Sequence, residues 1–213
     1  MSLGSKKLVL HTYWRSSASH RVRLALGYKG LPYQPVFVNL LQNEQRKPEY
    51  VEKSPMGHLP CLAIDGERFV ESTAIMELLD ELQPDPPLLP SKPEARARVR
   101  ALVQIINSGI QPLQNLIVLE RLGDDKEKRL EWLRFFIARG LGAFEQLADA
   151  KGPFAGGSTF GMTDCALIPQ LYAARRYGVD LAPYPRIVRA ENAAKELPFV
   201  AGADPDAQPD AKP

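Results

Sequence analysis

The stretch from Tyr13 to Arg23 reads YWRSSASHRVR and decides how the first part of the chain folds. An apolar, β-prone run over residues 8–13 leads into this stretch and ends before Arg15. Three serines follow Arg15 within four residues. From Val22 onward, apolar residues recur at helical spacing. This order predicts a strand, a tight loop and a helix.

The serines of this loop allow two interpretations. Serines at a helix start cap the free N–H groups of the first turn. The same N–H groups, together with the helix dipole, can hold an anion. A thiolate is such an anion, and a neighbouring hydroxyl would lower a thiol pKa from about 8.5 towards neutrality. The stretch by itself is compatible with a plain N-cap or with a thiolate site.

Composition narrows the class of protein. The chain has 213 residues, of which 45% are hydrophobic, which suits one large domain or two small ones. A net charge of +2 does not indicate a nucleic-acid surface. No apolar run approaches the roughly 20 residues that span a bilayer, and no signal peptide is visible. The two cysteines and three histidines lack metal-ligand spacing, which predicts no metal site and a reducing, cytoplasmic compartment.

Strand and helix signals continue on both sides of the opening stretch. A helix over 19–29 and a strand over 33–39 complete a βαβ unit with a parallel pair. Residues 44–53 are polar and predict a short helix. Strands over 61–64 and 68–70 flank Asp65-Gly66, a strong hairpin signal, and a helix over 72–82 follows.

The second half carries no strand signal. Five prolines within 84–93 predict a linker. Helical patterns cover 94–121, with a bend near Gly109 and Pro112, and then 126–150, 164–177 and 185–195. The sequence predicts an α/β part followed by an all-helical part. Residues 201–213 are rich in Pro, Asp and Ala and predict a disordered tail.

This organisation, with an X-Pro step before the third strand, resembles the soluble glutathione transferases over about residues 7–200. The run 15–23 resembles the signature of the zeta class, the maleylacetoacetate isomerases, although that signature has Cys where this chain has Ala18. The runs 109–116 and 180–185 are similar to the same class. The resemblance implies a thioredoxin-like βαβ-ββα glutathione-binding domain over 6–83, a linker over 84–93 and an all-helical domain over 94–200.

The resemblance also implies an activity and its partners. It implies an enzyme that uses glutathione to isomerise maleylacetoacetate to fumarylacetoacetate in aromatic catabolism, and a homodimer. The nearest rival activity is that of maleylpyruvate isomerase, although Leu116 and Ile117 are apolar where that activity would favour basic residues. A general transferase for small electrophiles such as α-haloacids, or a non-catalytic ligand-binding protein of the same fold, is also compatible with these motifs.

The same resemblance assigns catalytic roles. Ser16 is expected to donate a hydrogen bond to the glutathione sulfur, with Ser17 adding a donor. Tyr13 is the rival, because other classes use a tyrosine near this point. Because Ala18 replaces the family's cysteine, thiol-disulfide exchange is not expected. Arg15 and Arg176 are expected to bind the carboxylates of the substrate, with Arg175 as a weaker candidate than Arg176.

The remaining assignments concern the cofactor. Leu59-Pro60 matches the family's cis-proline, where the backbone of Leu59 would pair with the cysteinyl part of glutathione. Ser72 and Glu71 suit the γ-glutamyl carboxylate and ammonium groups, and Asp164 is expected to be a structural helix cap. The residues expected at the glutathione site are Ser16, Ser17, Ala18, Ser19, His20, Arg21, Gln45, Leu59, Pro60, Glu71, Ser72, Gln111, Asn115 and Leu116.

Overall fold

The structure, a computed structural model, describes residues 3–211. The chain divides into two compact units. Unit 1 runs from the N-terminus to Leu89 and resumes at Leu197, and unit 2 runs from Pro90 to Glu196. The last stretch of chain therefore belongs to the same unit as the first.

A four-stranded mixed sheet forms the centre of unit 1. Its strands β1 (Leu8–Thr12), β2 (Gln34–Phe37), β3 (Cys61–Ile64) and β4 (Glu67–Val70) lie in the order β2-β1-β3-β4. β1 pairs in parallel with β2 and antiparallel with β3, which is antiparallel to β4. Alternate residues of β1 are buried, as period-two patterning requires. The predicted βαβ-ββα order is confirmed.

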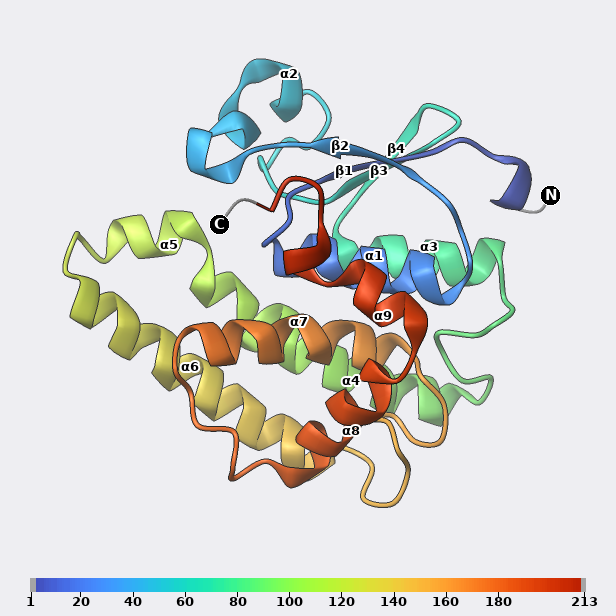
Figure 1. Ribbon diagram of the computed structural model, residues 1–213, viewed down its shortest axis with the longest axis vertical. Helices are drawn as coiled ribbons and strands as arrows, with labels where there is room; N and C mark the ends of the chain where they lie inside the picture. Colours follow the sequence, from blue (N-terminus) through green and yellow to red (C-terminus); the bar gives the residue numbers. More distant parts are fainter. Residues whose placement is uncertain (1–2, 212–213) are drawn as a thin grey trace. The chain divides into compact units, whose positions relative to one another are not determined.

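Helices α1 (Ser17–Tyr28) and α3 (Ser72–Leu82) pack together on one face of this sheet (Figure 1). The apolar residues Val22 and Leu26 of α1, and Ile75 and Leu79 of α3, are buried in the core. The connection from β2 to β3 contains the 3-10 turns η2 (Leu40–Gln42) and η3 (Glu44–Arg46) and the short helix α2 (Pro48–Val51). Another 3-10 turn, η1 (Leu3–Ser5), precedes β1.

The C-terminal segment is ordered where it is described, which corrects the expected disordered tail. Helix α9 (Pro198–Ala203) and the 3-10 turn η5 (Pro205–Ala207) follow unit 2 in the chain, and α9 lies beside α1 (Figure 1). Val200 and Ala203 are buried, and Phe199 approaches Gly27 so closely that a Cβ there would lie 3.1 Å from it. Order comes from these partners, which a local composition argument cannot see. Residues 212 and 213 lie outside the described part.

Unit 2 is helical. Its helices are α4 (Pro93–Gly109), α5 (Leu116–Arg121), α6 (Lys126–Leu147), α7 (Met162–Arg176) and α8 (Pro185–Lys195). The expected bend after Gly109 is a full break, since the 3-10 turn η4 (Gln111–Gln114) separates α4 from α5. Pro112 lacks the N–H that a continuous helix would need.

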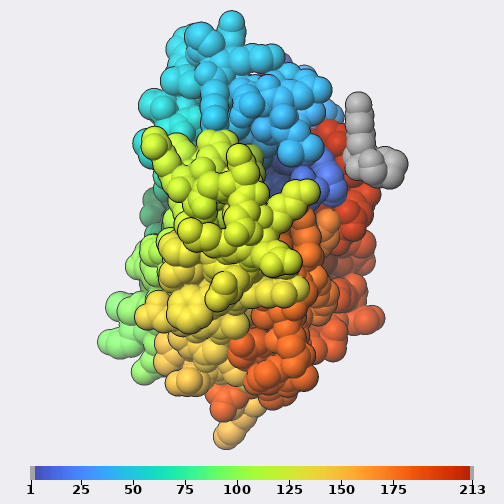
Figure 2. Space-filling model, turned by 90° about the vertical axis from the view of Figure 1, so that its left-hand side faces the viewer, coloured from blue at the N-terminus to red at the C-terminus, as the bar shows by residue number. Residues whose placement is uncertain are grey.

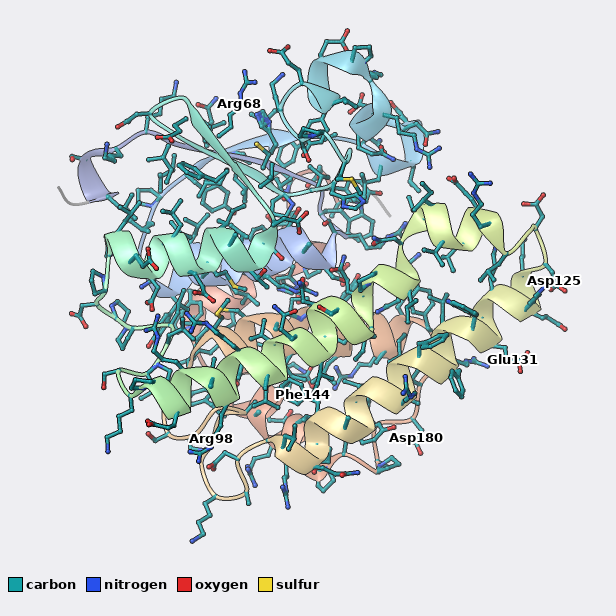
Figure 3. The ribbon with its side chains drawn as sticks, turned by 180° about the vertical axis from the view of Figure 1, so that it is seen from behind. Arg68, Arg98, Asp125, Glu131, Phe144 and Asp180 are labelled. Atoms are coloured by element: carbon teal, nitrogen blue, oxygen red, sulfur yellow. The ribbon has the colours of Figure 1, made fainter. Side chains whose placement is uncertain are left out.

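The core of unit 2 follows the predicted helical spacing. Leu133, Ile137, Leu141 and Phe144 of α6 are buried, whereas Glu131 and the N-cap Asp125 are exposed. Figure 3 labels Phe144 among the helices and places Asp125 at the start of α6. Within residues 3–211, none of the helices is long and apolar enough to traverse a bilayer.

Candidate functional site

A turn ends β1 and places Ser16 at the start of α1. The Ser16 N–H donates to the Tyr13 carbonyl at 3.0 Å, which closes the turn Tyr13–Ser16. Ser16 is the N-cap, and its Oγ accepts from the Ser19 N–H at 3.2 Å. The amides of Ser17 and Ala18 lie in the first turn, where no intrahelical acceptor exists. The helix start therefore offers hydroxyl and N–H donors to an anion.

The structure separates the two candidates for thiol activation. Tyr13 is only 5% exposed and belongs to an apolar cluster with Val38, Tyr50 and Leu59. Ser16 is half-buried and sits directly at the helix start. The hydroxyl of Ser16 thus lies at the N–H groups of the helix start, whereas Tyr13 is enclosed by apolar side chains.

The next residues of α1 turn inward. Ala18, Ser19, His20 and Arg21 are all buried. Ser19 Oγ and both His20 ring nitrogens are buried without a hydrogen-bond partner among the described residues. Burial, followed by the charges of Arg23 and Arg21, lowers the pKa of His20 well below 6.5, so His20 is neutral at physiological pH.

Arg21 connects α1 to the start of α3. Its Nη1 donates to Ser72 Oγ at 3.2 Å, and both side chains are buried. Glu71, which caps α3, has φ +67°, a region that residues other than glycine seldom adopt. Such backbone geometry concentrates at functional sites. Ser16 and Ser72, far apart in sequence, thus stand at the starts of two packed helices of unit 1.

The Leu59-Pro60 peptide bond is cis, as expected, and so is Asp85-Pro86. The Tyr50 hydroxyl and Ser54 Oγ both donate to the His58 carbonyl at 2.8 Å, which anchors the loop before Pro60. Gly57 in this loop has φ +63°, and a Cβ there would lie 2.8 Å from the Gln45 carbonyl oxygen. Gln45 is therefore held against the cis-proline loop.

Gln45 adds a polar group to this region. Its side chain is buried, and Oε1 has no hydrogen-bond partner within residues 3–211. Together with the helix-start donors, this orphaned amide oxygen fits a ligand with both amide and carboxylate groups, as glutathione has.

Gln111, Asn115 and Leu116 lie in unit 2. Gln111 is in η4 and its Nε2 donates to Asn115 Oδ1 at 3.5 Å, just before α5. Leu116 and Ile117 are exposed by 42% and 55%. Figure 2 shows this region of unit 2, in yellow-green, open on the surface.

The two candidate arginines of α7 differ in their contacts. Arg175 forms a two-pronged ion pair with Glu191 of α8. Arg176 is exposed, with its guanidinium 5.1 Å from the centre of the Tyr177 ring. Arg175 therefore serves to join α7 to α8, and Arg176 is the better candidate for an anion.

A cavity of about 790 Å³ in unit 1 adjoins the turn Tyr13–Ser16. Arg15 lines it, and its guanidinium lies 4.9 Å from the centre of the Trp14 ring. Asp206 and Asp210 of the C-terminal segment also line this cavity, which the sequence did not predict. No local signal identifies them, since acidic residues near a chain end usually stay in solvent. Among residues 3–211, no cluster of three or more His, Cys, Asp or Glu side chains could hold a metal ion.

Comparison with known families agrees with this geometry. Residues 10–87 match the N-terminal domain of glutathione S-transferases, and residues 131–206 match the C-terminal domain. A Drosophila melanogaster protein named probable maleylacetoacetate isomerase 2 is 46% identical over 208 residues, covering 96% of this chain and 91% of its own.

Solved structures of isomerases are also similar to this chain over nearly its whole length. A bacterial maleyl pyruvate isomerase, described as a zeta-class glutathione S-transferase, has a TM-score of 0.93 at 37% identity, covering 96% of this chain and 100% of its own. Maleylacetoacetate isomerase from Anaeromyxobacter dehalogenans was solved with bound glutathione, at a TM-score of 0.88, 46% identity, and 98% and 100% coverage. The same enzyme was solved with bound dicarboxyethyl glutathione and citrate, at a TM-score of 0.87, 46% identity, and 98% and 96% coverage. The chain therefore belongs to the glutathione S-transferase family, in the zeta class that contains the maleylacetoacetate isomerases.

Proposed function

We propose that this protein is a glutathione-dependent cis-trans isomerase that converts maleylacetoacetate to fumarylacetoacetate. The observation that carries the proposal is the Ser16 hydroxyl at the start of α1, beside first-turn N–H groups. The near full-length similarity to maleylacetoacetate isomerases supports the choice of substrate.

The residues of the chain have distinct roles in this proposal. When bound, glutathione supplies a thiolate whose reversible addition makes the conjugated double bond single long enough to rotate. Ser16 donates a hydrogen bond to the sulfur, and Ser17 with the helix N-terminus adds donors, so the thiol pKa falls. Arg15 and Arg176 stabilise the carboxylates and the negative charge that develops on the substrate.

The cofactor contacts are part of the same proposal. Ser72 and the first turn of α3 bind the γ-glutamyl carboxylate, and Glu71 binds the neighbouring ammonium group. The backbone of Leu59, before cis-Pro60, pairs with the cysteinyl part, and Gln45 offers its amide. The family motif also assigns Gln111, Asn115 and Leu116 to glutathione binding. We also propose that the protein acts as a cytoplasmic homodimer.

Maleylpyruvate isomerisation is the second candidate activity. A maleyl pyruvate isomerase is among the similar solved structures, and its substrate undergoes the same chemistry. Leu116 and Ile117 are exposed and apolar, where a maleylpyruvate isomerase of this family would be expected to carry basic residues, and this favours maleylacetoacetate. Comparing kcat/KM for the two substrates decides between them.

The test follows the loss of maleylacetoacetate with and without glutathione in the wild type and in Ser16→Ala, Ser16→Thr and Tyr13→Phe variants. We expect Ser16→Ala to lower kcat/KM by about a hundredfold or more, as loss of a single transition-state donor does. Ser16→Thr keeps the hydroxyl and the helix cap and controls for folding, and Tyr13→Phe should stay active. A fully active Ser16→Ala variant, or a wild type that binds glutathione but turns over neither substrate, would contradict the proposal.

A further inference from the structure

Asp210, close to the end of the chain, contacts the turn that carries the candidate catalytic residues. The Trp14 N–H donates to Asp210 Oδ2 at 2.9 Å. Trp14 and Arg15 are the two central residues of the turn Tyr13–Ser16. The orientation of the Tyr13–Trp14 peptide is therefore tied to a carboxylate 196 residues away.

The other side of Trp14 is held by Arg23, which is buried in α1. Arg23 Nη2 donates to the Trp14 carbonyl at 3.0 Å, and Nη1 lies 3.4 Å from the Tyr13 carbonyl. Nε of the same guanidinium donates to the Ala203 carbonyl of α9 at 3.0 Å. Both polar backbone groups of Trp14 are thus hydrogen-bonded, the N–H to Asp210 and the carbonyl to Arg23, which also binds the Ala203 carbonyl of α9.

The C-terminal segment is built to present Asp210. Gln208 Nε2 donates to the Gly202 and Asp204 carbonyls at 2.9 and 2.8 Å, which folds the chain back after α9. Asp206 and Asp210 then line the same cavity as Trp14 and Arg15. A carboxylate that accepts an N–H bond makes a charge-assisted hydrogen bond, which is about twice as strong as a neutral one.

We propose that Asp210 is a positioning residue for catalysis. By holding the Trp14 N–H, it fixes the turn so that the Ser16 hydroxyl and the Arg15 guanidinium keep their reactive orientation. This inference rests on the proposed function of Ser16 and Arg15. Asp210 acts through the backbone and does not contact the substrate.

The experiment compares Asp210→Ala, Asp210→Asn and Asp206→Asn in the full chain, with a chain ending at Pro209 as a second way to remove the carboxylate. Asp206→Asn is the matched control, because it removes an acidic charge from the same cavity wall without touching the Trp14 bond. Three readouts are used: hydrogen exchange of the Trp14 amide without ligand, the ultraviolet absorbance of bound glutathione thiolate against pH, and kcat and KM for isomerisation.

In Asp210→Ala and the shortened chain, we expect Trp14 exchange and kcat each to change by about tenfold, the equivalent of one hydrogen bond. Exchange becomes faster, kcat falls, the bound thiol pKa rises, and KM for glutathione changes less. Asp210→Asn should fall between the wild type and Asp210→Ala, because its amide oxygen still accepts but carries no charge, and Asp206→Asn should leave Trp14 exchange unchanged.

Two results would overturn the inference. One is unchanged Trp14 exchange in Asp210→Ala, and the other is faster exchange with an unchanged thiol pKa and kcat. If the wild type binds glutathione but does not isomerise maleylacetoacetate, the proposed function fails by itself. The exchange and absorbance readouts then still decide the role of Asp210.

Discussion

At the scale of single residues, Asp164 shows how burial can oppose ionisation even in a well-bonded carboxylate. Its oxygens accept from the Ala155 N–H at 2.9 Å and the Gly161 N–H at 3.0 Å, which joins the preceding loop to the start of α7. Burial nevertheless raises the pKa of Asp164 to about 6, against the effect of these bonds. The expected structural role agrees with these contacts, and the glycine N-cap is compensated by the carboxylate of Asp164.

This raised pKa predicts the sign of a pH dependence. Because the unfolded pKa is about 3.9, the folded state binds more protons between about pH 4 and pH 6. The free energy of unfolding contributed by Asp164 should fall as pH rises through that interval. Urea unfolding of the wild type and Asp164→Asn should show the wild-type advantage shrinking by on the order of 2 kcal/mol.

Asp149 provides the opposite control. Backbone N–H groups of Gly152 and Lys151 hold the pKa of Asp149 below its usual value, so its contribution should be lost as pH falls. The wild-type advantage over Asp149→Asn should therefore grow with rising pH. If the wild-type advantage in the free energy of unfolding changed with pH in the same direction for Asp164→Asn and Asp149→Asn, the raised pKa of Asp164 would be contradicted.

At the scale of elements, the proline-rich segment is less of a free linker than its composition indicates. Lys29, the C-cap residue after α1, donates from its Nζ to Asp80 Oδ1 of α3 at 2.9 Å and to the Gln83 and Pro86 carbonyls. Asp80 in turn accepts from the Leu88 and Leu89 N–H groups. The start of the expected linker is therefore bound to unit 1, and the division between the units falls after Leu89.

Removing this lysine should be costly. Lys29→Met leaves the Asp80 carboxylate without its cation in a site where the lysine side chain is 0% exposed. We expect the free energy of unfolding to fall by about 3–5 kcal/mol, as for other broken buried pairs. Lys6→Met is the control, because the Lys6–Asp65 pair is exposed and solvent screening should make its loss far smaller than that of the buried pair. Similar losses in the two variants, measured by urea unfolding, would refute the buried-pair argument.

At the scale of the whole molecule, the chain leaves unit 1, builds unit 2 and returns to unit 1 at Leu197. The return is held by Phe199, which packs on Gly27 and lies 5.7 Å from the Tyr28 ring. Unit 1 therefore includes a segment, from Leu197 onward, that is synthesised after unit 2.

This arrangement predicts that the far end of the chain stabilises the first unit. We expect Phe199→Ala to lower the free energy of unfolding by about 1–3 kcal/mol, since the ring is partly buried. Phe135→Ala, which truncates a ring that is 61% exposed, should cost less than about 0.5 kcal/mol. Thermal or urea unfolding compares the two, and an equal cost would mean that α9 adds no stability to unit 1.

The sequence by itself determined the features that depend on local pattern. Alternating and helical periodicity located β1, α1, α3, α6, α7 and α8 within a few residues, because each element buries one regular face. The serine-rich helix start pointed to an anion site because capping and anion binding use the same N–H groups. The family motifs then supplied the cis Leu59-Pro60 bond and the class of enzyme.

Only the tertiary structure decided which distant groups meet. Arg175 and Arg176 are adjacent and carry the same charge, but only Arg175 pairs with Glu191. The C-terminal segment carries too little apolar pattern to predict order, and Asp210 looks like any solvated acid. The C-terminal segment is ordered by contacts with Arg23, Gly27 and Trp14, which lie in the first part of the chain. Such contacts depend on the completed fold, because no periodicity within the segment encodes its partners.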